Sequence, residues 1–294
     1  PSSELSFIKR GICERSPAFF LGNSYNVSMS SKKNRYDNLR IEKSGHSARL
    51  IFNREEKANA LNKAFLIEIK EACLSFAEDV DTRVVIFSGL GKHFSSGADL
   101  SSSPNHEASL LKRRRDSRVG EEAILALLNM DQITIASWNG AAMGGGACIA
   151  TACDFRIGTP TSFMQYPEID IGVNLMWKSL PLLINLIGPS RSKRLVIGGD
   201  RIMGEELHTW GLLDKIVSEA ELSKEAQLLA DKYAQKAPIA AQMIKQSTNN
   251  IVNALSKEIM HMDFDQNLFT AQTRDRSKAI KSYLDKTEPA FEGD

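Results

Sequence analysis

The sequence predicts an α/β layered fold followed by a mostly helical C-terminal region. Short β-rich apolar segments alternate with amphipathic segments from residue 38 to residue 165. This alternation is typical of a sheet whose strands are joined by helical crossovers. After about Met176 the pattern becomes helical, and only residues 213–217 resemble a further strand. A chain of 294 residues can bury a substantial core, in one large domain or in two ordinary ones.

The elements of the α/β part follow from residue type and period. Residues 38–43 and 48–53 are expected to form two strands around the turn Ser44-Gly45-His46. Apolar residues at three- and four-residue steps predict an amphipathic helix over 62–78, and the run of Val and Ile in 83–88 predicts a buried strand. Further along we expect helices at 121–129 and 146–153, and strands at 133–138, 155–158 and 162–165.

The C-terminal part is expected to consist mainly of helices. The helical segments are residues 177–186, 190–197, 204–210, 222–235 and 238–250, with 255–284 mostly helical. We find neither an internal repeat nor a low-complexity tract.

The charge balance separates an N-terminal extension from the rest of the chain. The net charge of +1 excludes a generally basic nucleic-acid binder. Residues 1–36 hold eight serines and six basic residues against two acidic ones, a net +4, so the remaining 258 residues sum to −3. We interpret 1–36 as a disordered extension, or as a remnant of targeting or cloning, and exclude it from the fold. A cytoplasmic protein is expected, or a mitochondrial matrix protein if this segment is a transit remnant.

Cysteine, histidine and hydropathy patterns exclude several other classes. Four irregularly spaced cysteines fit neither a disulfide framework nor a zinc site, and the five histidines include no pair at metal-ligand spacing. No apolar run approaches the roughly 18 residues of a membrane-spanning helix. We therefore expect a globular protein with no metal and no membrane partner.

Glycine recurs where a strand is expected to end and a helix to begin. The three segments are residues 93–100, 139–146 and 166–172. The triplet Gly144-Gly145-Gly146 lacks the following Lys and Ser/Thr of a phosphate-binding loop and the spacing of a dinucleotide site. Two interpretations remain: an oxyanion site built from backbone N–H groups, or a tight packing junction between strand and helix.

Together these segments resemble the crotonase superfamily, the enoyl-CoA hydratase/isomerase family. The resemblance runs from about residue 38 to residue 294 and includes Asn53-Arg54-x-x-Lys57-Ala58-Asn59-Ala60-Leu61-Asn62 and Gly211-Leu212-Leu213-Asp214-Lys215-Ile216-Val217. It implies a crotonase-like fold of repeated ββα units over 37–210 and a helical trimerisation region over 211–294. Homotrimers, or dimers of trimers, are implied as well.

The ligand implied by this family is an acyl-CoA thioester, with CoA as part of the substrate and no separate cofactor. Its carbonyl would lie between the N–H groups of Ala98 and Gly145. The CoA contacts implied by the resemblance are Arg54, Lys57, Ala58, Ala60, Leu61, Asp99, Leu100 and, from a neighbouring subunit, Lys286. Ser101 stands where hydratases often carry lysine, which weakens one expected phosphate contact. The basic run 112–115 is interpreted as a solvated helix face, with phosphate contact as the alternative.

The carboxylates present decide which reaction is expected. Hydratases of this family carry a first glutamate two residues after the glycine triplet, where this sequence has Cys148, and a second one at the position of Glu168. A neutral thiol cannot replace an ionised carboxylate that holds water. Dienoyl-CoA isomerases add an aspartate where this chain has Met176. We therefore expect Glu168 to be the sole acid/base of an enoyl-CoA isomerase that moves a 3-enoyl double bond to the 2-position.

Other readings stay open at this point. A hydratase could work with Glu168 alone, and thioester hydrolysis or decarboxylation could also use one glutamate. A protein that binds acyl-CoA without catalysing a reaction is the non-enzymatic alternative, and some relatives contact RNA. The presence of Glu168 argues against a catalytically inactive protein. The net charge of −3 over residues 37–294 argues against general RNA affinity.

Overall fold

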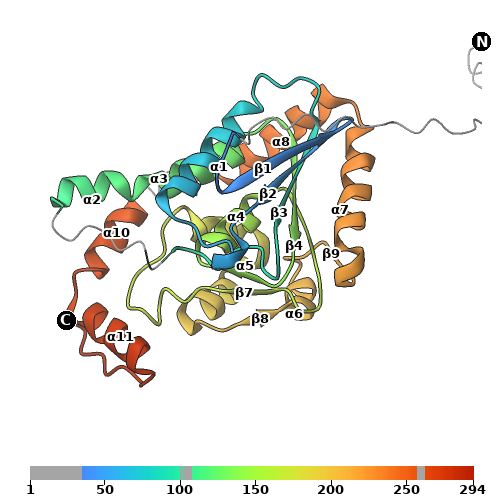
Figure 1. Cartoon of the computed structure of the whole chain (residues 1–294). Helices are drawn as coiled ribbons and strands as arrows, with labels where there is room; N and C mark the ends of the chain where they lie inside the picture. Colours follow the sequence, from blue (N-terminus) through green and yellow to red (C-terminus); the bar gives the residue numbers. More distant parts are fainter. Residues whose placement is uncertain (1–34, 100, 102–107, 257–261) are drawn as a thin grey trace, which may run out of the picture. The chain divides into compact units, whose positions relative to one another are not determined.

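The computed structural model describes residues 35–99, 101, 108–256 and 262–294 (Figure 1). The proposed extension, apart from its last two residues, and Leu100 therefore lie outside the described residues. Within the described part, no helix is long and apolar enough to cross a membrane.

One six-stranded sheet forms the centre of the fold. Its strand order is β1-β2-β3-β4-β6-β9, and all neighbours pair in parallel except β1 with β2. The strands are β1 (Leu39–Ser44), β2 (Ser47–Phe52), β3 (Val84–Gly89), β4 (Ile133–Trp138), β6 (Phe155–Gly158) and β9 (Lys215–Ile216). The predicted strands and the α/β class are confirmed, since parallel neighbours require the crossovers that the alternating pattern indicates.

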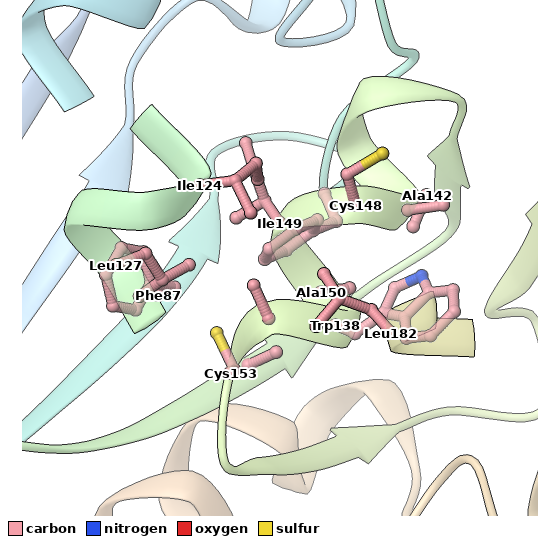
Figure 2. Packing of buried hydrophobic residues seen from close by; sticks show 14 of the residues in the cluster. Phe87, Ile124, Leu127, Trp138, Ala142, Cys148, Ile149, Ala150, Cys153 and Leu182 are labelled. Atoms are coloured by element: carbon pink, nitrogen blue, oxygen red, sulfur yellow. The ribbon is translucent and has the colours of Figure 1, made fainter. Parts of the chain in front are cut away.

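Helices cover both faces of this sheet. Val84 and Ile86 of β3 point to one face, where α7 (Glu219–Ala234) packs through Leu222 and Ala226. Phe87 points to the other face, toward α1 (Lys63–Ser75), α3 (Arg118–Leu128) and α4 (Gly145–Ala152). Figure 2 shows residues of that second layer, with Phe87 beside Leu127 and Trp138 near Leu182. Successive residues of a strand alternate between faces, so β3 is apolar throughout because both of its faces are buried.

A second, three-stranded sheet lies beside the first in the fold. Its order is β5 (Ala141–Met143), β7 (Phe163–Gln165) and β8 (Ile202–Met203). Sequence patterns did not indicate β5 or β8, because strands of three and two residues are too short to show a period. Strand β5 leads directly into the glycine triplet, and β7 leads into the segment that carries Glu168.

The helical C-terminal region is confirmed in outline. It comprises α5 (Ser179–Gly198), α6 (Gly204–Thr209), α7, α8 (Pro238–Val252), α10 (Asp263–Thr270) and α11 (Arg274–Asp285). Gly188, with φ of 76°, breaks α5 near the expected boundary between two helices. The predicted helical stretch 255–284 is interrupted after Thr270, because the Thr273 hydroxyl accepts a hydrogen bond from the Arg276 N–H and starts α11.

Candidate active site

Two loops bring the backbone N–H groups of Ala98 and Gly145 close together. The Leu61 N–H donates to the Gly97 carbonyl at 2.8 Å and the Asp99 N–H donates to the Leu61 carbonyl at 3.0 Å, so the Ala98 N–H takes no part in this short ladder. Gly145 is the first residue of α4, where N–H groups have no intrahelical acceptor. A Cβ on Gly97 would lie 2.6 Å from the Met143 carbonyl oxygen and 3.6 Å from the Gly145 nitrogen. Glycine at position 97 therefore permits the close approach of the two donors.

The glycine triplet is required by crowding on both sides of the start of α4. A Cβ on Gly146 would lie 2.6 Å from the Ser95 carbonyl oxygen, and a Cβ on Gly144 would lie 2.5 Å from Oε1 of Glu168. Gly144 also has φ of +46°. The structure therefore shows the tight packing junction, and this junction places the Gly145 N–H at the start of α4, where it has no intrahelical acceptor.

Glu168 presents a buried carboxyl beside this junction. Its Oε1 faces Gly144, and its Oε2 is buried without a hydrogen-bond partner among the described residues. Burial, assisted by the negative charge of Asp170, raises the pKa of the Glu168 carboxyl to about 7. A carboxyl with such a pKa can both accept and return a proton near neutral pH.

Cys148 contributes a thiol, and not a second carboxylate, to the same junction. Its side chain is 2% exposed, and its Sγ donates to the Gly144 carbonyl at 3.3 Å and lies within hydrogen-bond distance of Ser179 Oγ. Burial raises the pKa of the thiol to about 12. The thiol is therefore protonated at neutral pH and behaves as a small, largely apolar side chain.

The loop before Ala98 is fixed by an internal ion pair. Arg54 Nη1 lies 2.7 Å from Asp99 Oδ2 and donates to the Ala60 carbonyl at 2.7 Å. Asp99 Oδ1 also accepts from the hydroxyl of Ser101 at 2.6 Å. The structure thus places Arg54 and Asp99 as partners of each other, which connects the segment of residues 54–61 to the loop that carries Ala98.

Asn59, which lies within the motif of residues 53–62, is a positioning residue to which the sequence alone assigns no role. It is fully buried, with φ of 53°, and its amide donates to the carbonyls of Leu90 and His93 at 2.9 and 2.8 Å. Its own carbonyl accepts from the Ser95 hydroxyl at 2.8 Å. The available signal was the residue type, because asparagine is enriched among non-glycine residues in the left-handed region.

The remaining expected CoA contacts fall into two groups. Ala58, Ala60 and Leu61 lie with exposed Lys57 in the segment that pairs with the Ala98 loop. Lys286 is exposed at the end of α11, which Figure 1 shows well apart from α1 and the turn before it. One chain therefore does not bring Lys286 to this segment.

The basic run 112–115 lies on α2 (Leu110–Asp116) and is partly engaged within the chain. Arg114 donates to both carboxylate oxygens of Asp265 on α10, at 2.7 and 3.0 Å, and stacks over Phe264. Lys112 pairs with Asp116 one turn along the same helix. Over the described residues, no cluster of three His, Cys, Asp or Glu side chains could hold a metal ion.

A cavity of about 900 Å³ lies along the segment that follows Glu168. It is lined mainly by apolar groups of residues 168–175, of α10 and of the C-terminal end, among them Ile169, Val173, Leu175 and Phe269. Neither Ala98 nor Gly145 lines this cavity.

Comparison with known proteins gives matches over nearly all of the described chain. The profile of the enoyl-CoA hydratase/isomerase family matches residues 42–294. A crotonyl-CoA hydratase from Syntrophomonas wolfei is 30% identical over 257 residues, which cover 87% of this chain and 98% of that protein. A peroxisomal Delta(3,5)-Delta(2,4)-dienoyl-CoA isomerase from Arabidopsis thaliana is 33% identical over 202 residues, which cover 65% of this chain and 73% of that protein.

Solved structures agree with this match. An enoyl-CoA hydratase from Bacillus anthracis superposes with a TM-score of 0.70 at 27% identity, over 88% of this chain and all of its own. An enoyl-CoA hydratase from Mycobacterium avium gives a TM-score of 0.78 at 20% identity, over 87% and 99% of the two chains. The second likeness shows the fold alone.

Proposed function

Because the chain belongs to the enoyl-CoA hydratase/isomerase family, we propose that it moves the double bond of a 3-enoyl-CoA thioester to the 2-position with Glu168 as its sole acid/base. The expected superfamily and the crotonase fold are confirmed by the profile and by the superposed structures. The observation that supports the proposed reaction is the carboxyl of Glu168. It lies beside Gly144, and its buried Oε2 has no hydrogen-bond partner among the described residues, while the thiol of Cys148 in the same junction is protonated.

The proposed step is a proton transfer along the acyl chain. The thioester carbonyl oxygen accepts hydrogen bonds from the N–H groups of Ala98 and Gly145. Ionised Glu168 removes a proton from C2, and the electron pair moves into the carbonyl to form an enolate. Protonated Glu168 then donates that proton to C4, which leaves the double bond at C2. Each oxyanion donor of this kind is worth about 3 kcal/mol of barrier.

A pKa of about 7 suits both halves of this step. The carboxyl is ionised in part of the enzyme at neutral pH, and after it takes the C2 proton it is acidic enough to release that proton at C4. The apolar side chains of Ile171, Val173 and Leu175 follow Glu168 in the sequence and favour an active site from which water is excluded.

Hydration of a 2-enoyl-CoA is a second candidate, which the names of several relatives favour. A water that attacks C3 must be oriented and deprotonated, and two carboxylates do this readily. Here Cys148, with a thiol pKa of about 12, offers no negative charge to hold that water. Hydration by Glu168 alone is therefore expected to be slow.

Assembly into a trimer, or into a dimer of trimers, is part of the same proposal. Helix α8 leaves Ile239, Met243, Ile244 and Ile251 largely exposed in the single chain. Contiguous exposed apolar side chains of this kind mark interaction surfaces. Light scattering coupled to size-exclusion chromatography should give three or six chain masses, and a monomer at micromolar concentration would contradict this part of the proposal.

The reaction is tested by supplying 3-enoyl-CoA and 2-enoyl-CoA separately to the purified protein. We expect the 3-enoyl substrate to be converted to the 2-enoyl thioester, with little 3-hydroxyacyl product from either substrate. Fast hydration of the 2-enoyl substrate without isomerisation of the other would assign the chain to the second candidate.

A further inference from the structure

The indole of Trp177 fills a slot between two glycines at the active site. A Cβ on Gly120 of α3 would lie 1.9 Å from Cε2 of this ring, and a Cβ on Gly145 would lie 2.1 Å from its Cζ3. The same position on Gly145 is 3.1 Å from Cδ1 of Leu61. Only glycine at 120 and 145 leaves room for the ring. The indole and Leu61 therefore both lie against Gly145, whose N–H is one of the two proposed oxyanion donors.

The backbone that carries this ring adopts an unfavourable conformation. Trp177 and Lys178 have φ of 64° and 58°, in the left-handed region that large side chains rarely occupy. Neighbouring helices hold them there: the Lys178 N–H donates to Asp263 Oδ2 on α10 at 2.9 Å, and Lys178 Nζ lies 3.4 Å from Glu121 Oε1 on α3. Strain that is maintained in this way beside reactive groups is typical of functional segments.

No polar contact explains the position of the ring. The side chain is 8% exposed, and its Nε1 is buried without a hydrogen-bond partner among the described residues. A buried tryptophan usually finds an acceptor for this N–H. Packing against Gly120 and Gly145 therefore determines where the indole lies.

We propose that Trp177 ends the acyl pocket and restricts the enzyme to short acyl chains, such as four-carbon thioesters. This inference rests on the proposed function, because it places the thioester carbonyl at the N–H groups of Ala98 and Gly145. The first acyl carbons then lie beside Gly145, and a chain that extends toward α3 meets the indole after a few carbons. Longer chains gain no further burial, whereas an open pocket gives about fourfold in affinity for each buried methylene.

Binding of saturated acyl-CoA thioesters tests this without any turnover. Dissociation constants of four-, eight- and twelve-carbon thioesters are measured by calorimetry for the wild type, Trp177→Ala, Trp177→Leu and Trp210→Ala. Trp210 is the matched control, because it is also 8% exposed but packs at the end of α6 against Arg194. We expect the wild type and Trp210→Ala to bind eight carbons no more tightly than four. Trp177→Ala should bind the eight-carbon thioester at least tenfold more tightly than the wild type does.

The wild-type series alone can overturn the proposal. An affinity that rises about fourfold per methylene from four to eight carbons would show that the chain bypasses the indole, for example into the 900 Å³ cavity beside Glu168. An unchanged length profile in Trp177→Leu, which keeps an apolar side chain and is the milder change, would also overturn it. Failure of the wild type to bind any acyl-CoA would instead contradict the proposed function, and this proposal with it.

Discussion

Two segments of the candidate active site carry a buried acid, and the surroundings of these two acids shift their pKa values in opposite directions. Asp99 accepts from the Ser101 hydroxyl at 2.6 Å and pairs with Arg54 at 2.7 Å, and these two contacts lower the pKa of its carboxyl. Glu168 keeps a buried Oε2 that has no hydrogen-bond partner in the described part of the chain, and burial raises the pKa of its carboxyl to about 7. The Asp99 carboxylate therefore has an ion-pair and a hydrogen-bond partner, whereas Oε2 of Glu168 has neither among the described residues.

The difference separates a positioning role from a chemical one. A carboxylate that is paired and hydrogen-bonded holds charge and geometry constant, as the loop that orients the Ala98 N–H requires. A carboxyl that is desolvated and unpaired can change its protonation state during a reaction.

The largest expected effect is on turnover. Glu168→Gln keeps the shape of the side chain and removes the base, so isomerisation should fall by about three orders of magnitude while acyl-CoA affinity changes little. Asp170→Asn is the control, because that exposed carboxylate lies only two residues away. Initial rates and calorimetric binding measure both quantities. Activity of Glu168→Gln within tenfold of the wild type would remove Glu168 from the mechanism.

The next effect is on the free energy of unfolding as a function of pH. The pKa of Glu168 rises from 4.5 to about 7 on folding, so the folded chain holds a proton that the unfolded chain has lost. The contribution of Glu168 is therefore fully present below pH 4.5, and it is lost as pH rises toward 7. This loss amounts to about 3 kcal/mol. Urea titrations should show it in the wild type but not in Glu168→Gln, and parallel curves would contradict the raised pKa.

A smaller loss of stability is expected when the ion pair between Asp99 and Arg54 is removed. Asp99→Ala leaves Arg54 without its partner and should lower the free energy of unfolding by about 2 kcal/mol at neutral pH. Because the pKa of Asp99 is lowered on folding, its contribution is present above about pH 3.8 and is lost on acidification. Ser101→Ala removes only one hydrogen bond and should cost less. Equal effects of the two variants in urea titrations would refute the importance assigned to the ion pair.

The smallest effect is expected at Cys148. Replacement by alanine removes a buried, protonated thiol and should cost about 1 kcal/mol of stability while turnover stays within about threefold. Cys153→Ala is the matched control, since that thiol is buried too. Iodoacetamide should label neither residue in the folded protein. A hundredfold loss of turnover in Cys148→Ala alone would reveal a chemical role for the thiol.

Much of the fold could be predicted because its signals are local. The apolar period of residues 62–78 and the Val-rich run of β3 give α1 and the central strand directly, within a few residues of their observed ends. Strands β5 and β8 were not predicted. Strand β7 lies between them and sets their register, so their own sequence does not determine it.

The site was predicted by resemblance, and its geometry was not. The glycine triplet and Glu168 stand out in the sequence, but the clash that a Cβ on Gly144 would make with Glu168 is a contact between residues 24 apart. Likewise the pairing of Arg54 with Asp99 depends on how two loops fold together, so this ion pair between two expected CoA contacts could not be predicted from the sequence. Charge and burial at such positions arise from tertiary contacts that no local pattern encodes.

Burial raises the pKa of the Glu168 carboxyl to about 7, and the protonation state of this carboxyl can be observed directly. Infrared difference spectra of the wild type against Glu168→Gln, recorded from pH 4 to pH 9, isolate the C=O stretch of this one protonated acid. We predict a band that disappears with a midpoint near pH 7. A band that is already lost by pH 5 would mean an ordinary, solvated or paired carboxylate, and would contradict the role of Glu168 as an acid/base near neutral pH.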